Sequence, residues 1–234
     1  MVSERLLGLL LVASAACPAV AVDQEPLRDP ALDTILADGS NADVADDILQ
    51  KLKVAEIIPT VLDPFDPKLT ISVSWPDDVT AELGNTLDPS ETQKAPKVHF
   101  TDLSSDIIGL ASVQLTIAMT DPDAPSRDDP KWSEIAHWIA TNVPLKDAAI
   151  PSSKLRDVIE YKPPGPPPKT GKHRYVFAAL VPRNGTTEKL ELSKPSDRKH
   201  WGYEQKRRGL KNWAEENGLV VIGANFVYEQ NKQQ

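Results

Sequence analysis

The segment TDPDAPSRDDPKWSEIAHW, residues 120–138, places two carboxylates among prolines, continues into a charged turn and ends in an apolar stretch that holds His137. Asp121 and Asp123 stand in Asp-Pro and Asp-x-Pro sequences, which are common in turns. The same residue types also suit a metal site, half of a catalytic dyad or one wall of a binding pocket. This segment alone does not separate the four possibilities.

A second segment of similar form, YKPPGPPPKTGKHRYVFAALV, occupies residues 161–181. Prolines stiffen it, Gly171 provides a turn, and a strand is predicted from His173 onward. Because alternate side chains of a strand share a face, His173 and Tyr175 should point one way and Arg174 the other.

The strand after the first segment presents a histidine of its own. His137 should share a face with Ile135 and Ile139, whereas Trp138 should face the opposite way. If the two strands are neighbours, the histidines converge around one small polar cavity, together with Asp121, Asp123 and Tyr175.

Each motif also has a plainer interpretation. A single histidine on a strand is most often a core or surface residue whose hydrogen bonds are satisfied. The run GPPPK, residues 165–169, suits a polyproline II ligand or a linker, although predicted strands on both sides argue against a free linker.

In this order and at this spacing, DPDAPSR, His137 and GPPPKTGKHRY resemble the two signature regions of the phosphatidylethanolamine-binding protein family. The resemblance covers about residues 60–230 and includes the closing segment WAEENGLVVIGANFVYEQ. It implies a Greek-key β-fold with a small pocket for phosphate or the headgroup of phosphatidylethanolamine. The family positions that line or adjoin this pocket match Asp121, Asp123, Pro125, His137, Pro167, His173 and Tyr175, with Asp123 nearby to hold the loop. We assign Arg174 to a structural ion pair.

Fungal members of the family imply a serine carboxypeptidase as a protein partner. The acidic segment 22–58 could then be the inhibitory contact. Alternatively, it is a solvated leader followed by a helix that covers a sheet edge, and we favour this second interpretation. A secreted interaction protein with a vestigial pocket is a further alternative.

The periodicity of the apolar residues predicts the elements. Three- and four-residue spacing over 44–58 indicates an amphipathic helix that ends before Pro59. Alternation or apolar runs indicate about six strands, at 69–75, 97–100, 113–119, 135–143, 175–181 and 219–228. Another helix is expected at 203–217, with Gly218 as its stop. These elements favour a mainly β fold, an antiparallel β-sandwich with a few peripheral helices.

The N-terminus predicts the compartment. Residues 1–21 resemble a secretory signal peptide, with an uncleaved anchor as the competing interpretation. We therefore divide the chain into a signal at 1–21, an acidic extension at 22–58 and the family domain at 59–230.

The sole cysteine, Cys17, lies within the signal, so the mature chain should have no thiol. Asn184 begins the only N-glycosylation sequon, and a secreted or vacuolar glycoprotein is expected.

Charge and motif content exclude several classes of function. The net charge is −8, with 11 acidic and 3 basic residues over 23–66, so nucleic-acid binding is not expected. The basic excess over 194–211 is interpreted as one solvated face of a helix.

A catalytic site is also considered, either a triad of Ser126, His137 and Asp123 or a histidine acid–base pair. However, no G-x-S-x-G or H-E-x-x-H motif is present. We expect a monomeric, non-enzymatic binding protein without a membrane span, metal or cofactor.

Overall fold

The computed structural model describes residues 39–103, 113–145 and 149–233. The chain divides into two units, Met1–Asp38 and Gly39–Gln234, and the description below concerns the second. The predicted signal peptide and Cys17 lie outside the described residues. None of the helices described there is both long and apolar enough to cross a bilayer.

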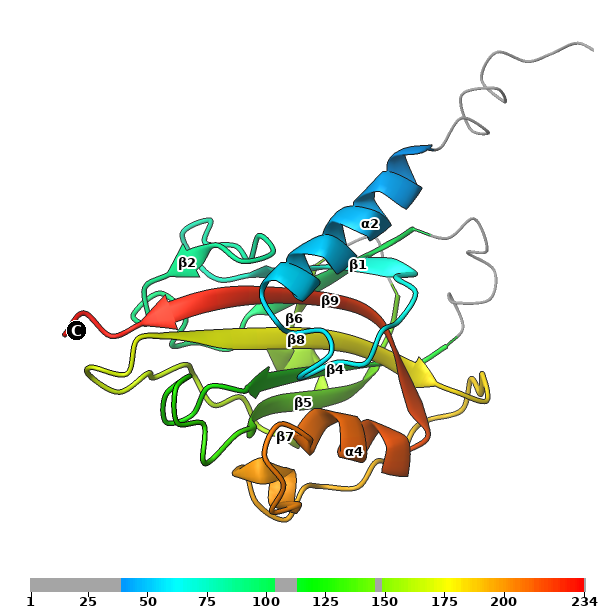
Figure 1. Ribbon diagram of the computed structural model, residues 1–234. Coiled ribbons are helices and arrows are strands. Elements are labelled where there is room, and N and C mark those ends of the chain that lie inside the picture. Colours follow the sequence, from blue (N-terminus) through cyan, green and yellow to red (C-terminus); the bar gives the residue numbers. More distant parts are fainter. Residues whose placement is uncertain (1–38, 104–112, 146–148, 234) are drawn as a thin grey trace, which may run out of the picture. The chain divides into compact units, whose positions relative to one another are not determined.

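Two sheets form the framework (Figure 1). The smaller has the order β1 (Leu69–Ser74), β3 (Lys97–Asp102) and β6 (Ile150–Pro151). The larger has the order β2 (Thr86–Leu87), β9 (Leu219–Gln230), β8 (Lys172–Pro182), β4 (Leu115–Asp121), β5 (Ile135–Val143) and β7 (Arg156–Ile159). All pairs are antiparallel except β2 with β9. The mainly β class is confirmed, and the Greek-key connection stays a prediction.

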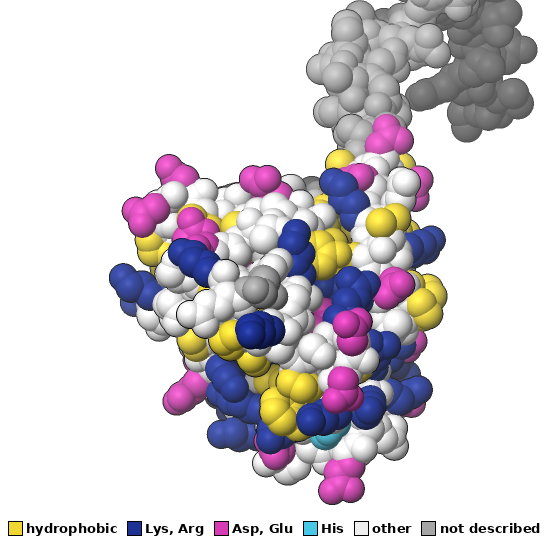
Figure 2. Space-filling view, turned by 60° about the vertical axis from the view of Figure 1, so that its left-hand side comes forward, with side chains coloured by type: hydrophobic (Ala, Val, Ile, Leu, Met, Phe, Trp, Pro, Cys, Tyr) yellow, Lys and Arg dark blue, Asp and Glu magenta, His cyan; other side chains and the backbone are white. Residues whose placement is uncertain are grey.

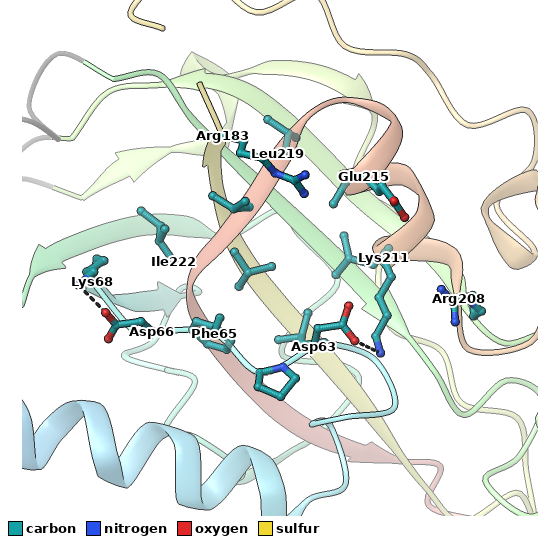
Figure 3. Close-up of a pocket in the computed structure, with 16 residues that line it drawn as sticks. Asp63, Phe65, Asp66, Lys68, Arg183, Arg208, Lys211, Glu215, Leu219 and Ile222 are labelled. Carbon is teal, nitrogen blue, oxygen red and sulfur yellow. Dashed lines mark hydrogen bonds and ion pairs between the residues drawn. The ribbon is translucent and has the colours of Figure 1, made fainter. Parts of the chain in front are cut away.

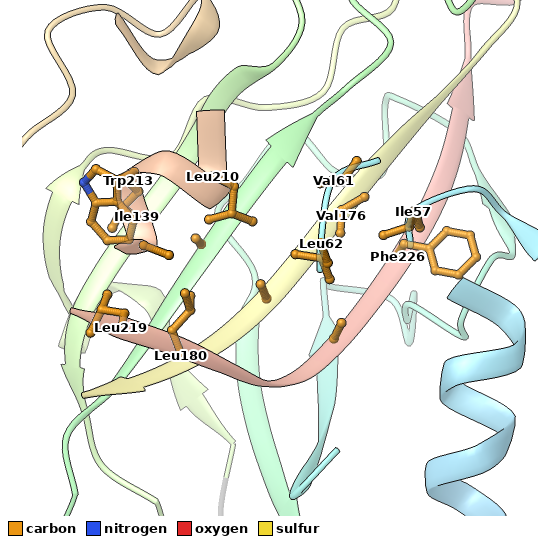
Figure 4. Close-up of a cluster of buried hydrophobic side chains, with 14 of the residues drawn as sticks. Ile57, Val61, Leu62, Ile139, Val176, Leu180, Leu210, Trp213, Leu219 and Phe226 are labelled. Atoms are coloured by element: carbon orange, nitrogen blue, oxygen red, sulfur yellow. The ribbon is translucent and has the colours of Figure 1, made fainter. Parts of the chain in front are cut away.

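The core lies on both faces of the larger sheet. One cluster of buried side chains, including Phe100, Leu115 and Phe177, fills the space between the two sheets. The other covers the opposite face and includes Val176 and Leu180 (Figure 4). The alternation of apolar and polar residues at 113–119 had indicated a strand with one buried and one exposed face. This was wrong, because β4 is central and every one of its residues is buried.

Two helices cover the outer face of the larger sheet. The helix α2 (Gly39–Val54) contributes Ile48 and Leu52 to the second cluster. The helix α4 (Gly209–Glu216) contributes Leu210 and Trp213. The segment 39–58, predicted as part of an extension, thus packs into the same core as the sheet.

The helix α2 ends four residues earlier than predicted. Glu56 has a left-handed backbone with φ of 55°. Its N–H donates to the Lys53 carbonyl oxygen at 3.0 Å, and the Ile57 N–H donates to the Leu52 carbonyl oxygen at 2.8 Å. This is the Schellman arrangement, which closes a helix and turns the chain away. Ala55 and Ile58 are nevertheless buried, so the predicted apolar spacing is correct beyond the helix itself.

The other boundaries differ in similar ways. The predicted helix at 203–217 begins only at Gly209, because Glu204 and Arg207 have positive φ angles. Most of the basic segment 194–211 is therefore not helical, apart from the short 3-10 turn η2 (His200–Gly202), and its interpretation as a helix face was wrong. The short strands β2, β6 and β7 and the 3-10 turn η1 (Ser152–Lys154) were not predicted, because two to four residues carry no periodicity.

Candidate functional site

The two signature segments meet at one end of the larger sheet. Asp121 ends β4, while β5 and β8 begin beside it, so their first residues flank the carboxylate. The sequence argument made convergence of the histidines conditional on β5 and β8 being neighbours. In the structure β4 lies between these two strands, and the histidines converge across its end.

A β-bulge sets the direction of His137. Met119 pairs with Trp138 and Thr120 pairs with Ala136, so His137 is an extra residue without a partner on β4. A bulge can place two consecutive side chains on one face. The His137 ring contacts Tyr175, which lies on the same face as Trp138, whereas Ile139 packs in the opposite cluster. The predicted faces of Ile139 and Trp138 relative to His137 were therefore wrong.

His173 is held by hydrogen bonds at both ring nitrogens. Its Nδ1 lies 2.9 Å from an Asp121 carboxylate oxygen, and its Nε2 lies 3.0 Å from the Thr170 hydroxyl oxygen. The Thr170 hydroxyl donates its own hydrogen to the Pro167 carbonyl oxygen, so it accepts from Nε2. Both ring nitrogens thus act as donors, which describes an imidazolium. Burial lowers the pKa of His173, but the hydrogen bond and charge of Asp121 outweigh it and the net shift is upward.

His137 is the neutral histidine of the pair. Its Nδ1 lies 2.7 Å from the Lys162 carbonyl oxygen and therefore carries the proton, leaving Nε2 as an acceptor. Burial lowers its pKa to about 4, against the opposing influence of the Asp121 charge. The two histidines consequently offer different chemistry, one cationic and one with a free lone pair.

Tyr175 lies between the two imidazoles. Its ring meets the His137 ring edge-on at 5.2 Å and is stacked with the His173 ring at 6.4 Å between centroids. The hydroxyl oxygen accepts from the Gly165 N–H at 3.4 Å, and the hydroxyl hydrogen is left to donate elsewhere. Burial raises the pKa of Tyr175 well above its ordinary value, so the group stays protonated.

The second carboxylate of the opening segment has a different role. Asp123 accepts from the Arg174 backbone N–H at 2.9 Å, from Nε at 2.8 Å and from Nη2 at 2.5 Å. Both side chains are buried, so Asp123 does not line the cavity described below. The structural ion pair assigned to Arg174 is present, and its partner is Asp123.

These residues surround a cavity of about 380 Å³. Six of the seven predicted ligand residues line it, namely Asp121, Pro125, His137, Pro167, His173 and Tyr175. The cavity is also lined by residues that sequence reasoning missed, among them Trp132, Lys162, Arg198 and Lys199. The excess of basic residues over 194–211 was a signal for two of them, but it was assigned to a helix face.

The missed residues decide the electrostatics of the cavity. The Arg198 guanidinium donates to the carbonyl oxygens of Ala136 at 2.9 Å, His137 at 3.1 Å and Glu160 at 2.8 Å. These acceptors are neutral, so they hold the group without cancelling its charge. With Lys162, Lys199 and the imidazolium, four cationic groups face the two carboxylates of Asp121 and Asp197. Such a cavity favours an anion.

The imagined hydrolytic triad is not assembled. Asp123 is committed to Arg174, His137 Nδ1 to a backbone carbonyl oxygen, and the Ser126 hydroxyl oxygen accepts from the Asp129 N–H. Over the described ranges, no cluster of three or more His, Cys, Asp and Glu side chains is arranged to hold a metal ion.

A larger cavity of about 580 Å³ lies elsewhere, between α4, β9 and the segment 62–68 (Figure 3). Its acidic and basic side chains are partly paired with each other, Lys211 with Asp63 at 2.7 Å and Lys68 with Asp66 at 2.5 Å. None of the predicted site residues lines it.

The predicted glycosylation site is not part of either cavity. Asn184 lies on an exposed turn after β8, and its glycosylation stays a prediction.

Comparisons with known proteins agree with the fold and the motifs. A family model described as "Phosphatidylethanolamine-binding protein" matches residues 77–227. An uncharacterised protein of Saccharomyces cerevisiae is 37% identical over 191 residues, which cover 79% of this chain and 94% of the relative. The carboxypeptidase Y inhibitor of the same yeast is 30% identical over 191 residues, covering 72% of this chain and 87% of the relative.

The solved structures include a carboxypeptidase Y inhibitor complexed with its cognate proteinase. Its chain superposes with a TM-score of 0.71 at 30% identity, covering 80% of this chain and 97% of that one. The matched span of the family model and the extent of these alignments lead to one conclusion: this chain belongs to the phosphatidylethanolamine-binding protein family.

Proposed function

We propose that the protein is a non-enzymatic binding protein whose cavity at the end of β4 takes a phosphoryl group, either free phosphate or a phospholipid headgroup. The observation that carries this proposal is the excess of cationic groups around a small cavity, with Arg198 held by neutral carbonyl oxygens. Arg198 and the Tyr175 hydroxyl would donate to phosphoryl oxygens. His137 Nε2 would accept from a protonated phosphoryl oxygen or from the ammonium of ethanolamine.

Isothermal titration with phosphate and with phosphorylethanolamine tests this function. Tyr175→Phe removes one donor to a charged ligand, worth about 1.5–3 kcal/mol, and should weaken binding by roughly ten- to a hundredfold. Arg198→Met should weaken it further. The control is His99→Gln on β3 in the smaller sheet, which should bind as the unmodified protein does. No heat of binding at millimolar ligand would support a vestigial pocket and contradict the proposal.

A second candidate function is inhibition of a serine carboxypeptidase. It is supported by the yeast carboxypeptidase Y inhibitor among the relatives and by the inhibitor–proteinase complex among the similar structures. Titration of the mature protein against carboxypeptidase Y tests it directly, and no loss of peptidase activity at a large molar excess would contradict it. A variant lacking residues 22–38 examines the acidic segment. The deletion stops at 38 because Ile48 and Leu52 belong to the core.

We also propose that the chain enters the secretory pathway and is secreted or delivered to a vacuole. The signal-like sequence and the exposed position of Asn184 support this. N-terminal sequencing of protein recovered from the medium or vacuole should begin at Val22. A sequence beginning at Met1 or Val2 would contradict the proposal.

A further inference from the structure

Trp132 is unusual among the aromatic side chains of the described residues because it is exposed. Its exposed fraction is 38%, whereas the other four tryptophans are buried. Lys131 Nζ lies 5.5 Å and Lys199 Nζ 4.7 Å from the centre of its ring. Tryptophan is an aromatic side chain with an apolar body and one polar N–H, a combination that is enriched at protein and membrane interfaces.

The position of Trp132 indicates such an interface. Trp132 lines the cavity proposed to take a phosphoryl group, as do the prolines Pro125, Pro163 and Pro167. The opening of the cavity therefore has an apolar rim, and the pyrrolidine rings of its prolines limit the flexibility of the backbone there. Figure 2 brings forward the side of the molecule where β4 ends and β8 begins, and there hydrophobic side chains gather in a patch bordered mostly by Lys and Arg, with some Asp and Glu among them.

Basic side chains outnumber acidic ones around the rim. Lys162, Arg198 and Lys199 line the cavity, and Lys131 adjoins Trp132. Three carboxylates lie nearby and are fewer than the basic groups: Asp121 lies against His173, Asp197 accepts from the Lys199 backbone N–H at 3.1 Å, and Asp129 lies 4.0 Å from Lys131. Amphipathic aromatic rings and lysines with apolar stems suit the headgroup region of a bilayer, and basic side chains are attracted to anionic lipids.

From these contacts we propose that the mouth of the cavity docks on an anionic lipid surface, with Trp132 at the level of the headgroups and Lys131, Lys162 and Lys199 against the lipid phosphates. This inference rests on the proposed function, because docking brings the cavity to a headgroup that is still part of a membrane. The prolines keep the rim fixed, so little conformational entropy is lost on contact.

Co-sedimentation of the mature protein with vesicles tests the docking. One set is pure phosphatidylcholine, and the other contains phosphatidylcholine with about 30% phosphatidylserine. The protein should bind the second set at low salt and be released at high salt. Lys131→Glu, at a position outside the cavity, should lower the partition coefficient about thirtyfold, because it changes the charge by two at about 1 kcal/mol per charge at such a surface. Trp132→Ala should also lower it severalfold. The matched controls, Lys53→Glu and Val54→Ala on the exposed side of α2, should leave it unchanged.

The position of the ring is measured separately. Phosphatidylcholine brominated in its acyl chains near the headgroup should quench the fluorescence of Trp132, and Trp132→Ala should abolish most of the quenching. Binding equal for both vesicle sets, or unaffected by Lys131→Glu and Trp132→Ala, would overturn the docking proposal. Capture of an acidic protein by this face without any vesicle binding would overturn it too. Titration of unmodified protein with soluble phosphorylethanolamine reports on the cavity alone and distinguishes failure of the pocket from failure of the docking.

Discussion

Asp121 and Asp123 are two residues apart and have different structural roles. Asp121 faces the cavity and holds His173 as an imidazolium, whereas Asp123 is buried against Arg174. Arg174 Nη1 also donates to the carbonyl oxygens of Ala55 at 2.7 Å and Glu56 at 3.0 Å, at the end of α2. The Asp123–Arg174 pair therefore ties the cavity loop, β8 and the N-terminal helix together without touching the ligand site.

The first prediction concerns this pair. Asp123→Asn leaves the Arg174 charge buried without a counter-charge, which typically costs about 3–5 kcal/mol of unfolding free energy. Urea denaturation followed by circular dichroism measures the loss. Asp47→Asn, which breaks the exposed pair with Lys51, is the matched control and should change stability by less than about 1 kcal/mol. Equal effects of the two substitutions would show that the buried pair is not a structural tie.

Among the elements, the sequence predicted the long strands and the existence of both helices. Strand β5 was placed with its observed bounds, because its run of apolar residues is long enough to stand out. The last residue of α2 and the first residue of α4 were misplaced because Glu56 and Arg207 have positive φ angles. A glycine at these positions would have indicated such a conformation in the sequence, whereas Glu and Arg do not. The bulge at His137 was invisible for a related reason, since it depends on the register with β4.

The second prediction tests whether α2 belongs to the folding unit although it precedes the matched family span. Leu52 is fully buried against the larger sheet, so Leu52→Ala should cost about 2–5 kcal/mol through lost burial and a cavity. Val54 lies on the same helix and is 79% exposed, so Val54→Ala should change stability by less than about 0.5 kcal/mol. Thermal or urea denaturation of both variants decides the matter. A tolerated Leu52→Ala would mean that α2 is an appendage.

The third prediction concerns the start of α4. Glu134 accepts from the Gly209 N–H at 3.1 Å, the Leu210 N–H at 3.4 Å and the Thr120 hydroxyl at 3.1 Å. Replacing it by alanine removes the acceptor of the Gly209 and Leu210 N–H groups in a buried place, which should cost about 2–4 kcal/mol. The Thr120 hydroxyl keeps the Ile135 carbonyl oxygen as an acceptor at 3.2 Å. Hydrogen exchange at Gly209 and Leu210 should accelerate in Glu134→Ala. Unchanged exchange at both amides would contradict the capping role.

At the scale of the whole molecule, the pattern of prolines and a histidine in each segment suggested a meeting only if the two strands were neighbours. The resemblance to the family implied that the two distant segments form one pocket. The sequence pattern could not predict that residues 194–208 would return to the same cavity. That return depends on a non-repetitive path held by contacts such as Arg198 with three backbone carbonyl oxygens. The cationic half of the site was missed for this reason.

The fourth prediction is a dependence of stability on pH. Burial raises the pKa of Glu229 to about 8, from an ordinary value near 4.3 in the unfolded chain. A raised folded-state pKa gives stability that is present at low pH and lost as pH rises toward 8, at about 1.4 kcal/mol per pH unit. Glu229→Gln should therefore lose less stability than the unmodified protein between pH 5 and 7.5. Glu188→Gln, at an exposed position, is the control and should follow the unmodified protein. Parallel curves for all three proteins would contradict the shift.

The cavity as a phosphoryl site is the central claim, and the histidine resonances report on it most directly. In a titration of the mature protein with phosphorylethanolamine, the imidazole signals of His137 and His173 should shift and saturate together, because both rings line the cavity. The His99 signal, from β3 in the smaller sheet, should stay in place. No shift of either cavity histidine at millimolar ligand, or equal shifts of all histidines, would contradict the claim.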